Sequence, residues 1–186
     1  MDLNLLRLRV ALLIAFLFAA LTVNRIALGR PIGVGNRLTQ DYEPPIPIVV
    51  STNFHGEGRS VFNKINIQRR IAGIDPLVWD ERLSEVALAY SKKMSSESFF
   101  SHIDPSGRLL PDRAIEIGVS NWARIGENLF RTNAFGNLAD SATEEWIGST
   151  SHLENLLDDA WTHTGVGVHR VSSGWTYVVQ VYSLKV

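Results

Sequence analysis

The chain has no cysteine among its 186 residues. This absence excludes disulfide bonds, thiolate metal ligands and a cysteine nucleophile together. The chain also lacks an excess of charge of one sign, because 18 lysine and arginine residues stand against 19 aspartate and glutamate residues. Binding to nucleic acid through its phosphates requires a basic surface, so we predict no nucleic-acid partner.

No largely apolar run reaches the roughly 20 residues that a membrane-spanning helix needs. The longest run, Val10–Val23, has 14 residues and follows Arg7 and Arg9. This length is typical of the apolar core of a signal peptide, although the cleavage pattern is weak, with Ala27-Leu28-Gly29 as its best match. We therefore predict that residues 1–28 are a signal peptide or a retained N-terminal membrane anchor. Both alternatives place the protein outside the cytoplasm, secreted or held at the membrane.

Residues 29–56 contain four prolines and show no persistent helical or strand period. This composition is typical of a linker. Residues 57–186 are predicted to form one folded domain, and the apolar fraction of the chain, 45%, is sufficient for a core.

Periodic patterns in residues 57–186 predict both helices and strands. The first helix is expected to stop near Gly73, and capping residues are expected at Asp80 and Asn137. The other expected elements are a buried helical stripe of Leu83, Val86, Ala87, Tyr90 and Met94, a short helix from Pro111, a strand at Arg124–Arg131, a helical turn at His152–Leu157 and a hairpin of Val166–Val171 with Trp175–Ser183.

His102 stands just before the sequence Asp104-Pro105-Ser106-Gly107. Aspartate, proline and glycine occupy the positions that a type I turn prefers. We therefore expect a tight turn to fix His102. Taken alone, His102 would ordinarily form a hydrogen bond to the backbone of its turn, and His152 would ordinarily cap a helix.

Six short motifs occur in an order that resembles a known family, the bacterial branch of the CAP superfamily, which comprises cysteine-rich secretory, antigen 5 and pathogenesis-related proteins. The motifs are Leu77-x-Trp79-Asp80-x-x-Leu83, Phe100-Ser101-His102 before the turn, Gly126-Glu127-Asn128-Leu129, Trp146 with Ser149-x-x-His152-x-x-Asn155-x-Leu157, Gly165-Val166-Gly167-Val168 and Tyr177-x-x-Gln180. The resemblance implies an α+β fold, a three-layer α-β-α sandwich with a small, mainly antiparallel central sheet.

The resemblance also implies a cleft lined by His102, Glu127, Ser149 and His152. Ser149 falls where related proteins carry a second acid, so the full set of two histidines and two acids is not met. Glu144 and Glu145 lie nearby, but we expect both to point away from the cleft if Trp146 is buried.

Two imidazoles and one carboxylate are a known ligand set for catalytic zinc. His102, His152 and Glu127 are thus the expected ligands if zinc or another divalent metal binds, and the expected catalytic residues if there is chemistry. The sequence contains neither a local metal-ligand spacing nor a nucleophile elbow, so no motif independently indicates an enzyme. We predict a binding module for a small-molecule, lipid, peptide or cell-wall ligand. A metal-dependent hydrolase of peptide or cell-wall material and a structural envelope protein with a vestigial cleft remain alternatives.

Overall fold

The computed structural model describes residues 54–186, and the segment predicted as signal peptide or anchor lies outside them. The elements in chain order are α2 (Phe54–Ile71), β1 (Val78–Trp79), α3 (Glu81–Ser96), α4 (Leu110–Glu116), β2 (Trp122–Thr132), α5 (Leu138–Gly148), α6 (Thr150–Leu157), β3 (His163–Arg170) and β4 (Thr176–Lys185).

Local signals at the helix ends act as the sequence indicates. The side chain of Asp80 accepts hydrogen bonds from the backbone amides of Arg82 and Leu83, and so caps α3. Asn137 caps α5 in the same way. Gly73 follows α2 with a φ of 76°, a conformation that glycine adopts without strain.

The four strands form one sheet in the order β1-β3-β4-β2. Only the short β1 pairs in parallel, with β3, whereas β3 with β4 and β4 with β2 are antiparallel. The sheet is therefore mainly antiparallel, as predicted. β3 begins at His163, three residues before the predicted start, because His163 and Thr164 pair with β1 as well as with β4.

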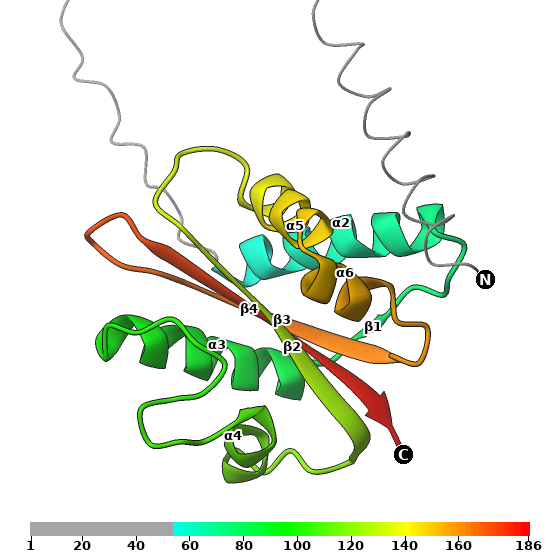
Figure 1. The fold of residues 1–186 in the computed structure, drawn as a ribbon, viewed down its shortest axis with the longest axis horizontal. Helices are drawn as coiled ribbons and strands as arrows, with labels where there is room; N and C mark the ends of the chain where they lie inside the picture. Colours follow the sequence, from blue (N-terminus) through cyan, green and yellow to red (C-terminus); the bar gives the residue numbers. More distant parts are fainter. Residues whose placement is uncertain (1–53) are drawn as a thin grey trace, which may run out of the picture. The chain divides into compact units, whose positions relative to one another are not determined.

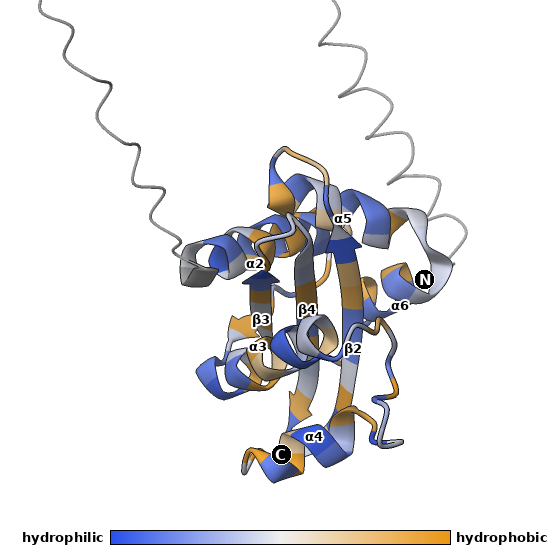
Figure 2. Ribbon diagram, turned by 90° about the vertical axis from the view of Figure 1, so that its left-hand side faces the viewer, coloured by the Kyte–Doolittle hydropathy of each residue, from blue (hydrophilic) through white to orange (hydrophobic). Residues whose placement is uncertain are grey.

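Helices cover both faces of the sheet (Figure 1). On one face, α3 and α4 pack over a core that includes Leu83, Tyr90 and Leu129. On the other face, α2, α5 and α6 pack over a core that includes Ile65 and Trp146. Figure 2 shows short hydrophobic segments among paler ones along the strands, and mixed hydropathy along the helices, as expected for a sheet between amphipathic layers. The predicted three-layer α-β-α sandwich is confirmed.

Gly165 and Gly167 let α3 approach β3 closely. A Cβ at Gly165 would lie 2.1 Å from the backbone nitrogen of Ser84, and a Cβ at Gly167 would lie 2.1 Å from that of Leu88. Neither side chain could be accommodated without moving the helix. The two glycines therefore set the distance between the α3 layer and the sheet.

Candidate functional site

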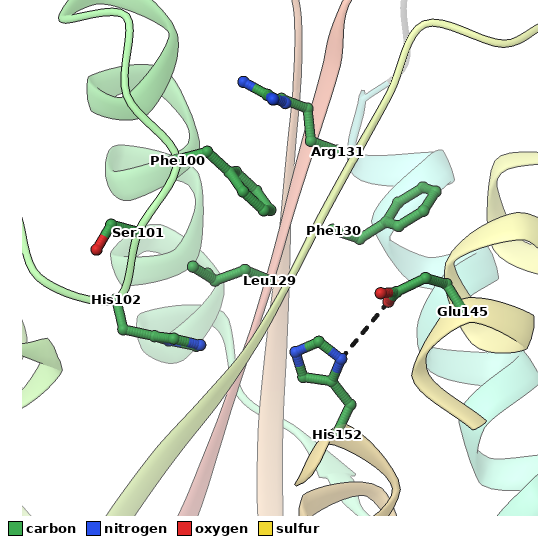
Figure 3. A pocket seen from close by; sticks show the side chains of 8 residues that line it. All are labelled: Phe100, Ser101, His102, Leu129, Phe130, Arg131, Glu145 and His152. Atoms are coloured by element: carbon green, nitrogen blue, oxygen red, sulfur yellow. Dashed lines mark ion pairs between the residues drawn. The ribbon is translucent and has the colours of Figure 1, made fainter. Parts of the chain in front are cut away.

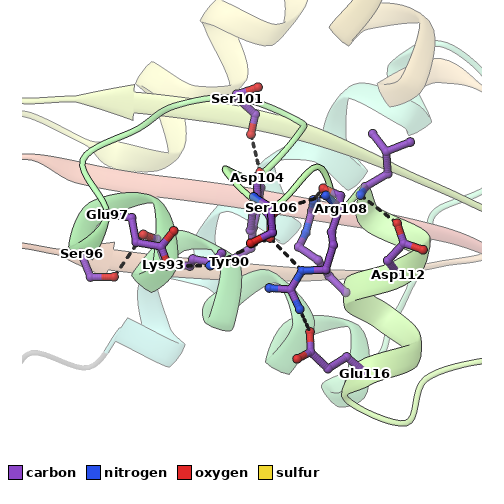
Figure 4. Close-up of polar contacts among 12 residues, drawn as sticks. Tyr90, Lys93, Ser96, Glu97, Ser101, Asp104, Ser106, Arg108, Asp112 and Glu116 are labelled. Carbon is purple, nitrogen blue, oxygen red and sulfur yellow. Dashed lines mark hydrogen bonds and ion pairs between the residues drawn. The ribbon is translucent and has the colours of Figure 1, made fainter.

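The loop that carries His102 connects α3 to α4 and is fixed by a buried aspartate (Figure 4). The Asp104 carboxylate accepts hydrogen bonds from the backbone amides of Ser106 (2.8 Å) and Arg108 (3.0 Å). The Gly107 amide donates to the Asp104 carbonyl at 2.8 Å, which closes the predicted turn. At the start of the loop, the hydroxyl of Tyr90 donates to the Ser101 carbonyl at 2.6 Å. Both ends of the His102 segment are therefore held.

His102 contacts Glu127 rather than the backbone of its turn. Its Nδ1 lies 3.0 Å from Glu127 Oε1. A guanidinium nitrogen of Arg113, in α4, donates to both oxygens of Glu127 at 2.8 Å, and a second nitrogen donates to the His102 carbonyl at 3.0 Å. Arg113 and Glu127 are buried, at 5% and 8% exposure, whereas the His102 side chain is 52% exposed. A buried ion pair thus stands behind a half-exposed histidine.

Tyr90 completes the surroundings of this ion pair. The guanidinium carbon of Arg113 lies 3.4 Å from the centroid of the Tyr90 ring, a cation–π contact. Burial raises the pKa of Tyr90 to about 12, and the nearby Arg113 charge offsets only part of that effect. The hydroxyl therefore keeps its proton at neutral pH and can donate to Ser101.

The other half of the site lies at the free edge of β2. Carbonyls on this edge have no neighbouring strand, and side chains from α5 and α6 bind them instead. Trp146 Nε1 donates to the Leu129 carbonyl at 2.9 Å, and Asn155 donates to the Glu127 carbonyl at 3.2 Å. Asn128 donates to the His152 carbonyl at 3.0 Å. These bonds dock α6, and His152 with it, against the strand that carries Glu127.

His152 pairs loosely with Glu145. Its Nδ1 lies 3.6 Å from Glu145 Oε2, too far for a hydrogen bond. Burial lowers the pKa of His152, with a further lowering from His102, while Glu145 acts in the opposite direction. The side chain is 20% exposed, and its neutral form is favoured.

The expectation that Glu145 points away from the cleft is wrong. Trp146 is fully buried, but a neighbouring residue on a helix is rotated by only about 100°, so burial of one does not turn the other to the opposite side. The helix is also interrupted at Ser149, which is both the C-cap of α5 and the N-cap of α6 and has an extended backbone conformation. This break places the His152 ring 3.6 Å from Glu145, in the last turn of α5.

A cavity of about 220 Å³ lies where the two layers meet at the edge of β2. Figure 3 shows the rings of His102 and His152 turned toward each other at one end of the cavity. The eight residues that line it are Phe100, Ser101, His102, Leu129, Phe130, Arg131, Glu145 and His152. The structure thus brings both predicted histidines to one cavity. Glu127 lies behind His102 and Ser149 at the helix junction, and neither is among the lining residues.

The predicted metal ligands do not form a three-ligand set. Within residues 54–186, no three histidine, aspartate or glutamate side chains are grouped so that they could hold a metal ion. Glu127 does not fit as the third ligand, because both of its oxygens accept from the buried guanidinium of Arg113. Its position instead matches the outer carboxylate that orients a histidine ligand. Metal binding by the two imidazoles stays a prediction.

Arg113 and Arg131 were missed by the sequence analysis, and Glu145 was wrongly excluded from the cleft. A signal for Arg113 exists, since it lies three residues after Leu110 and next to Ala114, both of which belong to the buried face of α4. An arginine on a buried helical face needs an acidic partner, and Glu127 in the adjacent strand supplies it. Arg131 follows Glu127 and Leu129 at steps of two, on one face of β2.

Comparison with known proteins identifies the family. Residues 62–182 match the family model CAP, the cysteine-rich secretory protein family. The chain belongs to the CAP family. Two Bacillus subtilis proteins are similar to this CAP chain. The uncharacterized membrane protein YlbC is 33% identical over 112 residues, which are 60% of this chain and 31% of YlbC. The uncharacterized protein YkwD is 30% identical over 118 residues, which are 63% of this chain and 44% of YkwD.

A solved structure shows the same CAP fold. An extracellular protein containing an SCP domain from Bacillus anthracis is similar with a TM-score of 0.65 and 29% identity, over 76% of this chain and 45% of that chain. The CAP chain thus spans less than half the length of each of these three relatives. Between residues 54 and 186, no helix of the CAP domain has the length and apolar character needed to span a bilayer.

Proposed function

We propose that this CAP domain is an extracytoplasmic binding module, which holds a hydrogen-bond donor group of a small ligand between His102 and His152. The name of the Bacillus anthracis protein calls it extracellular, and that of YlbC calls it a membrane protein. These names support a location outside the cytoplasm. The observation that carries the proposal is the pair of imidazoles facing one cavity, with a buried ion pair behind one of them.

The ion pair determines which nitrogen of His102 can bind a ligand. The Glu127 carboxylate, whose charge is balanced by Arg113, can only accept a hydrogen bond from the imidazole. The His102 proton is therefore assigned to Nδ1. The lone pair on Nε2 is then available as an acceptor. Burial lowers the pKa of His152 and so favours its neutral form, and Figure 3 shows one of its nitrogens turned toward His102. Two acceptors at one end of a cavity suit a hydroxyl or N–H donor of a lipid, peptide or cell-wall fragment.

The cavity volume limits what enters. Sites for drug-sized ligands usually exceed about 300 Å³. At about 220 Å³, this cavity suits a fragment of a dozen or so non-hydrogen atoms, or one end of a longer ligand. Among residues 54–186, no third metal ligand joins the two imidazoles, so we do not extend the proposal to a metal-dependent hydrolase.

The test compares two neutral probes that differ by one hydroxyl, 3-(4-hydroxyphenyl)propanamide and 3-phenylpropanamide. Binding to the detergent-solubilised full chain is followed through the imidazole NMR signals of His102 and His152. The hydroxyl should strengthen binding about three- to tenfold, and His102→Ala should remove that gain. His169→Ala is the matched control, since His169 is a half-buried histidine of β3 that does not line the cavity. An equal affinity for both probes, or none, would contradict the proposal.

The metal form of the proposal is tested separately with zinc chloride alone, by calorimetry at pH 8, because metal binding requires neutral imidazoles and is favoured by high pH. Uptake of about one equivalent that is lost in His102→Ala and in His152→Ala would support a zinc ion between the two rings. No uptake would remove the metal from the proposal and leave the donor site.

A further inference from the structure

Arg131 presents a positive charge at the cavity end opposite the two imidazoles (Figure 3). It lies in β2, opposite Tyr177 of β4, and is exposed to solvent. Within the described residues it has no carboxylate partner. Most other arginines of the domain do have one, namely Arg59, Arg82, Arg108, Arg113, Arg124 and Arg170. Arg131 is thus the cation available to an anion that enters the cavity.

Aromatic rings hold the Arg131 guanidinium in place. Its central carbon lies 4.7 Å from the ring centroid of Trp175, 5.0 Å from that of Phe100 and 6.0 Å from that of Tyr177. Contacts with ring faces leave the N–H groups at the edge of the guanidinium plane free to donate. An arginine restrained in this way loses less conformational entropy when it binds a carboxylate than a freely moving one does.

The wall between the two ends of the cavity is apolar. Phe100, Leu129 and Phe130 line it, and Phe100 leaves 40% of its surface exposed. The imidazole end carries the opposite charge to Arg131, because the Glu145 carboxylate lies there and Arg113 already neutralises Glu127. An anionic group would be repelled at the Glu145 end and attracted at the Arg131 end. The two ends of the cavity therefore differ in charge, positive at Arg131 and negative at Glu145.

We infer that the ligand is a small amphiphile with a carboxylate, whose anionic group binds Arg131 and whose apolar body lies over Phe100 and Leu129. The donor group at its other end meets the two imidazoles, so this inference rests on the proposed function. The charge polarity of the cavity, from Arg131 to Glu145, fixes the orientation of the ligand.

The experiment uses 3-(4-hydroxyphenyl)propionate, which combines a phenol hydroxyl, a ring and a carboxylate, and compares it with the neutral 3-(4-hydroxyphenyl)propanamide. Both are titrated by calorimetry into the detergent-solubilised full chain at pH 7 and low salt. The propionate should bind about tenfold or more tightly than the amide, because a charge-assisted bond to arginine is stronger than a neutral one. Arg131→Gln should abolish this preference, so that the propionate and the amide bind the variant with similar affinity.

Two further variants separate charge from structure. Arg131→Lys keeps the charge but loses the planar donor group, so it should retain only part of the preference. Arg170→Gln, at an exposed arginine of β3 that pairs with Glu57, should retain all of it. A preference that survives Arg131→Gln, or equal binding of propionate and amide to the unaltered protein, would overturn the inference while the donor site stands. Failure of both probes to bind would overturn the proposed function and this inference together.

Discussion

His102 and His152 line the same cavity, but charged groups hold one and neutral groups hold the other. His102 is bonded to Glu127, which is paired with the buried Arg113. The backbone of His152 is fixed by the amide of Asn128, while its ring lies 3.6 Å from Glu145 without a hydrogen bond.

The difference concerns what each imidazole is free to do. The carboxylate behind His102 fixes its ring orientation and its tautomer, so it offers the same acceptor atom to every ligand. No such bond restrains the His152 ring, and its protonation depends on burial and on one exposed carboxylate. His102 is therefore the preorganised half of the site, and His152 is the less restrained half.

The largest effect on stability is expected from Arg113→Met, which removes the ion pair with Glu127 behind His102. Glu127 would keep its burial but lose its counter-charge, and an uncompensated buried charge costs about 3–5 kcal/mol. We expect a loss of this size in the free energy of unfolding, measured with urea and tryptophan fluorescence. The His102 NMR signals should also shift, because Glu127 is no longer held.

Two controls define this prediction. Arg170→Met breaks an exposed pair with Glu57 and should cost about 1 kcal/mol or less. Combining Arg113→Met with Glu127→Leu removes both charges, and should recover much of the loss. If Arg113→Met costs no more than Arg170→Met, the ion pair does not stabilise the His102 half.

A smaller effect is expected from Asn128→Leu, which breaks the neutral half. Asn128 is fully buried and donates to the His152 carbonyl and to the Tyr182 hydroxyl. Leucine has a similar volume but leaves these groups unpaired, so the free energy of unfolding should fall by roughly 1–3 kcal/mol. The NMR signals of His152 should move and those of His102 should stay. Equal movement of both would show that the two halves are coupled.

The sequence predicted the fold well because its signals are local. The caps at Asp80 and Asn137 act on amides two and three residues away, and the turn at Asp104 closes on Gly107. Helical and strand periods then determine which side of each element is buried. The early start of β3 was missed because it depends on pairing with the distant β1.

The same locality limits prediction of the site. The pairing of Arg113 with Glu127 joins a helix to a strand. The buried face of α4 indicates that Arg113 needs an acidic partner, but the neighbouring sequence does not show which acid supplies it. The position of Glu145 relative to His152 was mispredicted because it depends on the break between α5 and α6 at Ser149, which no periodicity reveals. The family motifs supplied His102 and His152. Which charged side chains surround these histidines could be determined only from the packed structure.

The smallest effect concerns the pH response of His152. Because burial lowers the pKa of His152 below its usual value of about 6.5, the unfolded chain binds this proton more readily than the folded one. The stability that the neutral ring contributes is therefore present above about pH 6.5 and lost as the pH falls through the folded pKa. The unfolding free energy of the unaltered protein minus that of His152→Gln should decrease over this range. The subtraction cancels His163 and His169, whose pKa values burial also lowers.

Glu145→Gln sharpens this test, because the Glu145 carboxylate raises the pKa of His152 against the effect of burial. Its removal should move the NMR titration of His152 to lower pH, and the pH range of the stability loss should follow. Glu144→Gln is the matched control, at an exposed acid one residue earlier in α5 that does not line the cavity. A titration that moves upward in Glu145→Gln, or equally in both variants, would mean that Glu145 does not control the charge of the His152 half.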